Sequence, residues 1–175
     1  MQLIAPVTDY IPASTLTTLG DMIVRGAALP ERLGLTHMFH VYLSGDVVVG
    51  TGAWVDIDFD TVLYNLGGDF DIITDFRLEV TEAGYWFINL KVNLENPADG
   101  TQLQVRLDNN GFSTAVGQNV AGAAKDISAS CCFSGEVETG GYVQGELRHD
   151  AGANRNMLGG NRIWTSMIGF RLPIL

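Results

Sequence analysis

Residues 84–94 read Gly-Tyr-Trp-Phe-Ile-Asn-Leu-Lys-Val-Asn-Leu, and this stretch decides the fold. Its residues fall into two sets that alternate along the chain. Successive side chains of a β-strand point to opposite faces, whereas a helix repeats every 3.6 residues. The stretch therefore predicts a strand with one wholly apolar face. That face consists of Trp86, Ile88, Leu90, Val92 and Leu94.

The opposite face of this strand carries two more aromatic residues, Tyr85 and Phe87, before it turns polar. A strand with one face in water needs only polar side chains on that face. We therefore expect the second face to be covered as well.

Length and composition limit what this strand can belong to. The chain has 175 residues, enough for one hydrophobic core, and a formal net charge of −10. Its ten Lys and Arg residues are spread along the chain, which argues against a nucleic-acid-binding surface. No apolar run approaches the ~20 residues of a membrane-spanning helix, so no membrane partner is predicted. The 46% hydrophobic residues with 21 Gly are typical of a turn-rich globular β protein.

Two features predict synthesis in a cytoplasm without export. The N-terminus lacks the basic segment and the long apolar run of a secretory signal peptide. The two cysteines are the neighbours Cys131 and Cys132, and a disulfide between adjacent residues would be strained. We therefore expect both thiols to be reduced.

Residues 1–35 differ from the rest of the chain. They contain three prolines, the last of them Pro30, and show no sustained periodicity. This pattern predicts an extended arm with at most one short regular piece at residues 20–26. Ordering backbone costs ~1–2 kcal/mol per residue, and the arm has few contacts of its own to offset that cost. We therefore expect residues 1–35 to attach to a partner surface and residues 36–175 to form a folded head.

From residue 37 onward, the sequence predicts about ten strands separated by turn residues, and no helix. Asn110-Gly111 is a strong signal for a two-residue hairpin turn between two of these strands. In the last strand, residues 163–172, we place Phe170 in the core. Many short strands without helices indicate an all-β sandwich or barrel.

In the region 56–172, three residues have the spacing that opens a known family's signature: Phe59, Asn65 and Phe70. The later positions of the signature are approximated, with small shifts in spacing, by Phe76 and by residues 84–88, 140–143 and 166–172. The region resembles the jelly-roll head shared by the globular head of the first complement component and the tumour necrosis factor ligands. This resemblance implies an antiparallel jelly-roll β-sandwich that assembles into a homotrimer.

The resemblance also implies roles for both faces of the strand at residues 84–94. Tyr85 and Phe87 would meet their copies near the threefold axis, where aromatic pairs contribute ~0.5–1.5 kcal/mol each beyond area burial. The alternative is that a loop of the same chain covers Tyr85 and Phe87. The core residues that we expect are Phe59, Trp86, Ile88, Leu90 and Phe170.

Residues 16–33 resemble a segment that recurs in structural proteins of tailed phages. Arm and head together predict a virion structural protein that decorates or cements a phage capsid and binds the major capsid protein or another virion protein. It would lie on the virion surface after assembly in the host cytoplasm. The alternatives are the receptor-binding tip of a phage tail fibre and a secreted or spore-surface trimeric ligand. The arm residues expected to attach are Leu19, Met22, Ile23, Val24, Leu29 and Leu33.

The sequence contains no nucleophile elbow, phosphate-binding loop, dinucleotide fingerprint or zinc-ligand spacing. It therefore predicts no enzyme and no cofactor. The three histidines are scattered, and we expect no metal at them. Asp56, Asp58 and Asp60 share one strand face and are the best calcium candidates, because calcium prefers oxygen ligands. No EF-hand-type loop accompanies them, so we expect a solvated outer face there.

Overall fold

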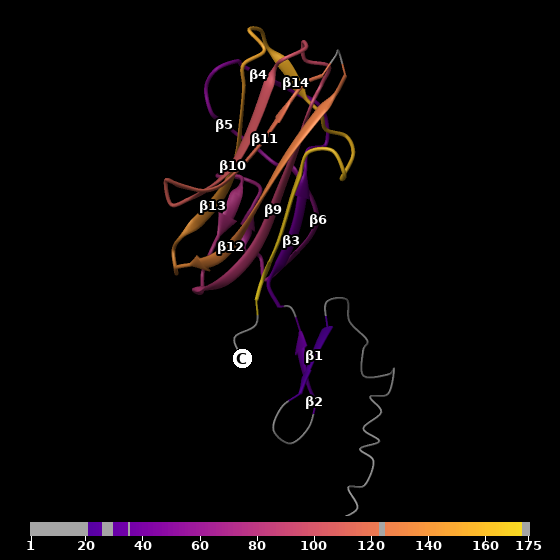
Figure 1. Cartoon of the computed structure of the whole chain (residues 1–175). Coiled ribbons are helices and arrows are strands. Elements are labelled where there is room, and N and C mark those ends of the chain that lie inside the picture. The colour runs from indigo at the N-terminus through magenta and orange to yellow at the C-terminus, as the bar shows by residue number, and fades with distance from the viewer. Residues whose placement is uncertain (1–20, 26–29, 35, 123–124, 173–175) are drawn as a thin grey trace, which may run out of the picture. The chain divides into compact units, whose positions relative to one another are not determined.

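The chain divides into two units, residues 1–35 and residues 36–175 (Figure 1). All regular structure among the described residues is β-strand. None of those residues forms a helix that could cross a membrane. The residues that the computed structural model describes are 21–25, 30–34, 36–122 and 125–172.

In the N-terminal unit, β1 (Asp21–Arg25) and β2 (Pro30–Gly34) form an antiparallel hairpin. The short regular piece that the sequence predicts coincides with β1, whereas β2 is an addition to it. Pro30 occupies the first position of β2, and a strand tolerates proline there. Of the residues expected to attach, Met22, Ile23 and Val24 lie on β1 and Leu33 on β2, whereas Leu19 and Leu29 lie outside the described residues.

The head consists of two antiparallel sheets, named here after β9 and β10 (Figure 1). In the β9 sheet the strand order is β4-β14-β9-β15-β3-β6, and β12 pairs along the other edge of β9. Its strands are β3 (Met38–Tyr42), β4 (Val47–Val49), β6 (Thr61–Leu66), β9 (Gly84–Leu94), β12 (Ile127–Val137), β14 (Arg155–Met157) and β15 (Ser166–Arg171).

In the β10 sheet the strand order is β11-β10-β13-β8-β7, and the short β5 also pairs with β13. The two sheets pack face to face as an antiparallel jelly-roll sandwich, which confirms the predicted fold class. The strands of this sheet are β5 (Val55–Asp56), β7 (Phe70–Asp71), β8 (Arg77–Glu79), β10 (Gln102–Asn109), β11 (Phe112–Val120) and β13 (Tyr142–His149).

The described part of the head holds seven and six strands in its two sheets, more than the ten or so predicted. β6 and β14 were not predicted, and the stretch 54–59 pairs as a strand only at β5. Its side chains still alternate, because Ile57 and Phe59 are fully buried between exposed aspartates. The N–H of Ile57 donates to the carbonyl of Gly145 at 2.9 Å, so the segment follows β13 without a regular ladder.

The hairpin between β10 and β11 turns at Asn110 and Gly111, as predicted. Both residues have positive φ, 54° and 84°. A type I′ turn needs this conformation at both central positions, and its twist matches that of the flanking strands. The turn therefore sets the pairing of β10 with β11.

The cysteines on β12 are both free, as predicted. Cys131 is buried and Cys132 is exposed, because neighbours on a strand point to opposite faces. Burial raises the pKa of the Cys131 thiol to about 12, so this thiol stays protonated and unreactive at neutral pH.

The core lies between the two sheets and is centred on β9. Trp86, Ile88 and Leu90 are fully buried, and residues inside and outside alternate along the whole strand, which confirms the predicted period of two. Phe59 is fully buried from the other side of the core, and its ring lies 6.2 Å from that of Phe70. Burying a side chain of this kind stabilises the fold by roughly 1.5–3 kcal/mol.

The structure corrects the placement of Phe170 in the core. On β15, Phe170 pairs with Phe87 of β9, and cross-strand partners share a face of the sheet. Phe170 therefore points away from the core and is only partly buried. The residues of β15 that face inward are Met167 and Gly169. The prediction was wrong because the outward residues of this strand are more apolar than the inward ones.

Gly169 leaves the space that a core ring occupies. A Cβ atom at Gly169 would lie 2.6 Å from the ring of Phe39 and 3.2 Å from the side chain of Ile88. We expect Gly169→Ala to lower the free energy of unfolding by about 1–3 kcal/mol, because the core must shift to accept the methyl group. Gly50→Ala is the matched control, since no atom lies within 4 Å of its Cβ position. Equal urea midpoints for the two variants would contradict this expectation.

Candidate functional site

The face of the β9 sheet that turns away from the core, called here the outer face, carries a row of apolar side chains. Phe87, Phe170, Met38 and Leu66 are successive cross-strand partners on β9, β15, β3 and β6. The rings of Phe87 and Phe170 lie 5.3 Å apart at an interplanar angle of 32°. These four side chains, called here the apolar row, cross the sheet near the Gly84 end of β9.

The outer face becomes polar toward the Leu94 end of β9. The third row across the sheet begins with Lys91, whose Nζ donates to the carbonyl oxygen of Ile163 at 2.8 Å. A lysine held in this way keeps its charge near water and is unsuited to a dry contact. The apolar surface is therefore confined to one end of the face. The second row, between the apolar row and the row of Lys91, consists of Asn89, Ile168, His40 and Tyr64.

Tyr85 and Phe87 both lie on the outer face, at its apolar end. Tyr85 is 55% exposed, and Leu66 in the apolar row is 45% exposed. The segment that contains Ile163 reaches the outer face at Lys91, which lies at the opposite, polar end. Among the described residues, no loop of the same chain buries Tyr85. The apolar end of the outer face is thus open to a partner.

A second apolar patch lies on β11, the edge strand of the β10 sheet. Val116 and Val120, called here the β11 patch, are 60% and 55% exposed and pair with Arg106 and Gln102 on one face of the sheet. Phe112 is 75% exposed but lies on the other face, because the register of β11 shifts by one residue between Ser113 and Ala115. β11 also contacts β12, because the side-chain amide of Asn119 donates to the carbonyl of Ser128 at 2.8 Å. This patch was not predicted from the sequence, although Val116 and Val120, apolar residues four positions apart, were the signal available.

His40 lies in the middle of the outer face between two tyrosine rings. Its ring centroid is 5.8 Å from that of Tyr64 and 6.4 Å from that of Tyr42. Its Nε2 atom is shielded from solvent and has no hydrogen-bond partner in the part of the chain that the structure describes. Burial lowers the pKa of His40 below its ordinary value of 6.5, a backbone hydrogen bond at Arg162 opposes this shift, and the charge of Arg162 adds to it. The imidazole is therefore neutral at pH 7.

We expect the head to lose stability as the pH falls below 6.5, and His40→Gln to remove part of that loss. The unfolded chain takes up a proton at His40 near pH 6.5, whereas the folded chain does so only at a lower pH, so acid favours unfolding between these two values. Asp60, whose pKa is lowered from 3.8, acts only in stronger acid. Urea unfolding between pH 5 and pH 7 measures the difference. Identical pH profiles for both proteins would contradict it.

The calcium candidates Asp56, Asp58 and Asp60 are all exposed, and they do not converge. Among the described residues, no cluster that could hold a metal ion includes them. Residues two apart on a strand lie ~6.6 Å apart along it, too far for one ion to bridge easily. Asp60 is also engaged elsewhere, because it accepts hydrogen bonds from the N–H of Ser44 at 2.7 Å and from the hydroxyl of Thr61 at 3.0 Å.

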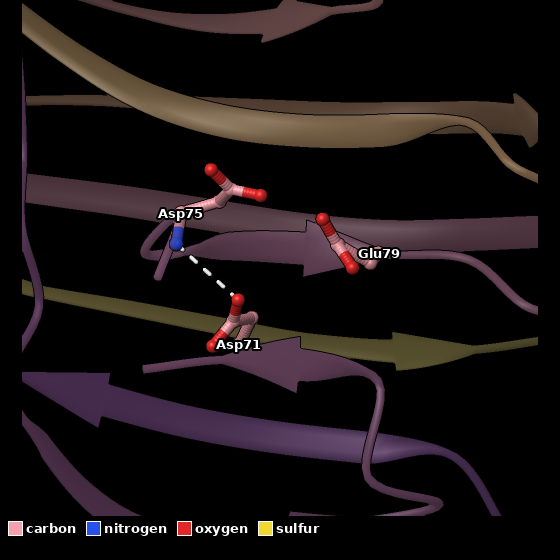
Figure 2. A group of neighbouring side chains, drawn as sticks. All are labelled: Asp71, Asp75 and Glu79. Atoms are coloured by element: carbon pink, nitrogen blue, oxygen red, sulfur yellow. Dashed lines mark hydrogen bonds between the residues drawn. The ribbon is translucent and has the colours of Figure 1, made fainter. Parts of the chain in front are cut away.

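Three other carboxylates do come together, a grouping that the sequence did not indicate. Ligand oxygens of Asp71, Asp75 and Glu79 lie within 4.8 Å of one another on and between β7 and β8 (Figure 2). Asp71 already accepts hydrogen bonds from the N–H groups of Ile73 at 2.8 Å and Thr74 at 3.2 Å. These bonds lower the pKa of Asp71 and fix the turn between the two strands.

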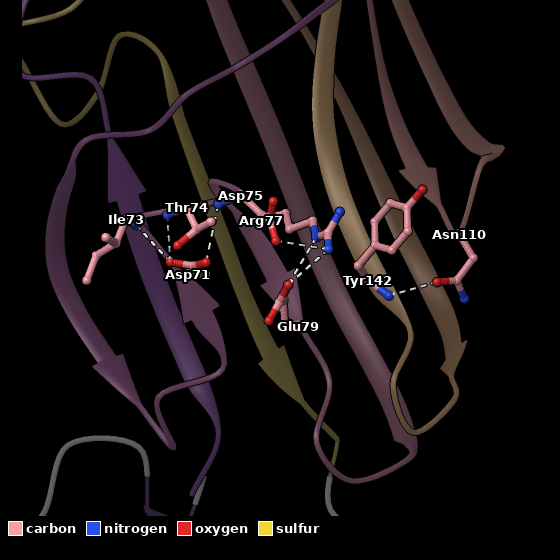
Figure 3. Close-up of polar contacts among 8 residues, drawn as sticks. All are labelled: Asp71, Ile73, Thr74, Asp75, Arg77, Glu79, Asn110 and Tyr142. Atoms are coloured by element: carbon pink, nitrogen blue, oxygen red, sulfur yellow. Dashed lines mark hydrogen bonds and ion pairs between the residues drawn. The ribbon is translucent and has the colours of Figure 1, made fainter.

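Arg77 neutralises part of this acidic group. Its Nη2 atom lies 3.2 Å from a carboxylate oxygen of Asp75 and 3.0 Å from one of Glu79 (Figure 3). The guanidinium also lies over the ring of Tyr142, 4.3 Å from the centroid. This arrangement is a salt-bridged turn that braces β8 against β13.

Neither acidic surface should bind calcium strongly enough to stabilise the head. A structural ion would raise the melting temperature by mass action when saturating, and a chelator would lower it. We expect the melting temperature to be the same with calcium, with chelator, and with sodium chloride at equal ionic strength. A rise of several degrees specific to calcium would refute this expectation.

The other two histidines differ in their surroundings. His37 lies 2.8 Å, through Nδ1, from a carboxylate oxygen of the buried Asp69. His149 is buried, with Nε2 3.4 Å from the carbonyl of Val49. No metal-ligand cluster among the described residues includes a histidine.

Comparison with known proteins identifies the fold but no sequence relative. No family model matches the chain, and no curated protein matches it. Eiger TNF from S. frugiperda superimposes with a TM-score of 0.59 at 14% identity, over 79% of this chain and 92% of that chain. The globular domain of the zebrafish complement 1qA protein gives 0.58 at 15% identity, over 79% and 99%. Murine APRIL at pH 5.0 gives 0.59 at 12% identity, over 78% and 98%.

The head therefore has the jelly-roll fold of tumour-necrosis-factor-like domains and complement globular heads. This finding confirms the fold that the sequence resemblance implied. At identities of 12–15% the likeness is one of fold alone, and the function must be argued from the surface of this chain.

Proposed function

We propose that the head forms a homotrimer and that the trimer decorates or cements the shell of a tailed-phage particle. The observation that carries the assembly is the open apolar end of the outer face. Phe87 and Phe170 stack there beside Tyr85, which is 55% exposed. Contiguous apolar surface of this kind on a folded domain marks a site of protein interaction.

Assembly of the head into a cyclic oligomer would bury both of its apolar patches. A twofold contact joins a patch to its own copy, so a dimer through the outer face would leave Val116 and Val120 in water. In a cyclic trimer, each chain presents two different patches to its two neighbours. The outer face belongs to the β9 sheet and the β11 patch to the edge of the β10 sheet, so the two surfaces suit a head-to-tail contact.

Along the outer face the side chains change from apolar at the Gly84 end of β9 to polar at the Leu94 end. This change supports one orientation of the heads about the threefold axis. Apolar side chains near the axis at the Gly84 end would exclude water. Lys91 and its polar neighbours at the Leu94 end would remain hydrated. The threefold contact would therefore be tightest at the end of the head where the described chain enters at Thr36 and leaves at Leu172.

Attachment to a particle is the part of the proposal that rests on residues 1–35. Residues 16–33 resemble a segment of tailed-phage structural proteins, and β1 and β2 lie within or next to that segment. An isolated two-stranded hairpin is marginally stable in water, so a partner that extends or covers it would stabilise it. A trimer also matches the local threefold positions of an icosahedral shell.

Electron microscopy of purified particles labelled against the head tests this assignment. Label distributed over the whole shell is the expected result. Label confined to the tail would favour a receptor-binding tip instead. Particles without label would contradict the virion role. The remaining alternative would then be a secreted or spore-surface trimeric ligand.

A further inference from the structure

A pocket of about 300 Å³ lies at the end of the head opposite to the apolar row. Its lining comes from Val48 on β4, from residues 154–156 at β14, and from Glu95 and Asn96 just after β9. β4 and β14 lie together at one end of the sandwich (Figure 1), and β14 pairs with β9 at Leu94. The pocket is thus complete within one chain.

Hydrogen bonds between two pairs of residues hold the walls of the pocket in place. The N–H of Glu95 donates to the carbonyl of Asn156 at 2.8 Å, and the side-chain amide of Asn156 donates to the carboxylate of Glu95 at 2.6 Å. The N–H of Asn96 donates to the carboxylate of Asp126 at 3.0 Å. The lining residues Glu95 and Asn96, just after β9, and Asn156 on β14 are therefore preorganised.

Several polar groups of the lining have no partner among the described residues. The guanidinium of Arg155 makes no hydrogen bond or ion pair with any of them. Its Nε atom is shielded from solvent, whereas its two terminal nitrogens are not, so a ligand can reach only the latter. The side-chain amides of Asn96 and Asn154 are likewise unengaged within the described chain. Donors and acceptors that no described group engages are available to the oxygens of a ligand.

The chemistry of the lining selects the class of ligand. Val48 is its one apolar side chain, which disfavours an apolar ligand. The charges of Glu95 and Arg155 are opposite, so neither an anion nor a cation is favoured by net charge. Amides both donate and accept, and the hydroxyl groups of a sugar do the same. The volume lies at the lower limit of small-molecule pockets and suits a single sugar residue.

We propose that this pocket binds a neutral sugar residue, with Arg155, Asn96 and Asn154 bonded to its hydroxyl groups. A glycan would thus be recognised at the end of the head farthest from the apolar row. One small polar pocket binds weakly, but copies on one assembly act together at high effective concentration. The pocket does not depend on the assembly, so a failure of either idea is distinguishable from a failure of the other.

Saturation-transfer NMR on the full-length chain tests the proposal. The probes are glucose, galactose, mannose and N-acetylglucosamine at millimolar concentrations, with N-acetylneuraminic acid as a charged sugar. At least one neutral sugar should receive saturation. Arg155→Met should weaken its binding at least about tenfold, the effect expected when a charged hydrogen bond is lost. Binding of the charged sugar alone, or of none of the probes, would overturn the proposal.

Two further variants separate loss of binding from loss of folding. Asn154→Ala changes an exposed residue before β14, so it should fold normally and still weaken binding. Gln104→Ala is the control, because Gln104 lines a different polar pocket with Gln102 and Arg148. It should bind the sugar as the parent does. Unchanged binding in Asn154→Ala together with Arg155→Met would assign the sugar to another surface.

Discussion

Phe87→Asp should leave the chain as monomers or as insoluble protein. The substitution places a carboxylate in the apolar row beside Phe170, and a trimer would bring three of them toward one axis. Removing each charge from water costs several kcal/mol, and its described neighbours in the apolar row, Phe170, Met38 and Leu66, carry no positive charge to offset this cost. In the monomer the same position is only partly buried, so the fold itself should tolerate the change better than the assembly does. Light scattering on a size-exclusion column measures the mass.

Two companion variants make this test specific. Ile73→Asp adds the same charge at a residue that is 83% exposed and belongs to neither apolar patch, so it should keep the parent mass. Val116→Asp should reduce the mass as Phe87→Asp does, because a head-to-tail contact needs both patches. If Phe87→Asp kept the parent mass, the outer face would not be the interface.

Removing residues 1–35 should separate attachment from folding. The head forms a unit of its own from Thr36 onward, and its core is built entirely from that unit. A chain beginning at Thr36 should therefore have the melting temperature of the full-length protein. It should also assemble into the same number of copies. It should fail to bind undecorated particles. In the parent trimer, three arms act at high effective concentration, so attachment should be tight and slow to reverse.

Pelleting of particles with each protein decides this second point. Full-length trimer should co-sediment with particles that lack the protein, and the shortened trimer should stay in the supernatant. The match in melting temperature between the two proteins is the control for folding. Equal co-sedimentation would assign attachment to the head and remove the proposed role of residues 1–35.

Local patterns in the sequence predicted much of the fold. The strict alternation at residues 84–94 is a property of the backbone, so β9 and its buried face followed directly. The turn at Asn110 and Gly111 followed from the rarity of positive φ in other residues. The three-residue β14, inside a polar loop, carries too little pattern to be recognised.

The candidate site was only partly predictable, because it depends on which strands lie side by side. Tyr85 and Phe87 were found from one strand alone. Their neighbours Phe170, Met38 and Leu66 come from three other strands and join them only through the register of the sheet. The same lack of register information placed Phe170 in the core.

The acidic residues also show that sequence patterns do not reveal which side chains meet in a sheet. Asp56, Asp58 and Asp60 looked clustered in the sequence, but an extended backbone keeps alternate side chains apart. Asp71 and Glu79 come together across two paired strands and a turn. Spacing along the chain is therefore a poor guide to ligand clusters in a sheet protein.

The mass of the full-length protein in dilute solution tests the central claim most directly. The chain has a mass of 18.9 kDa, and light scattering at several concentrations should give three times that value. The mass should hold at high salt, because the proposed contact is apolar and salt screens only charge interactions. A stable mass of 18.9 kDa, with the outer face open to water, would contradict the account.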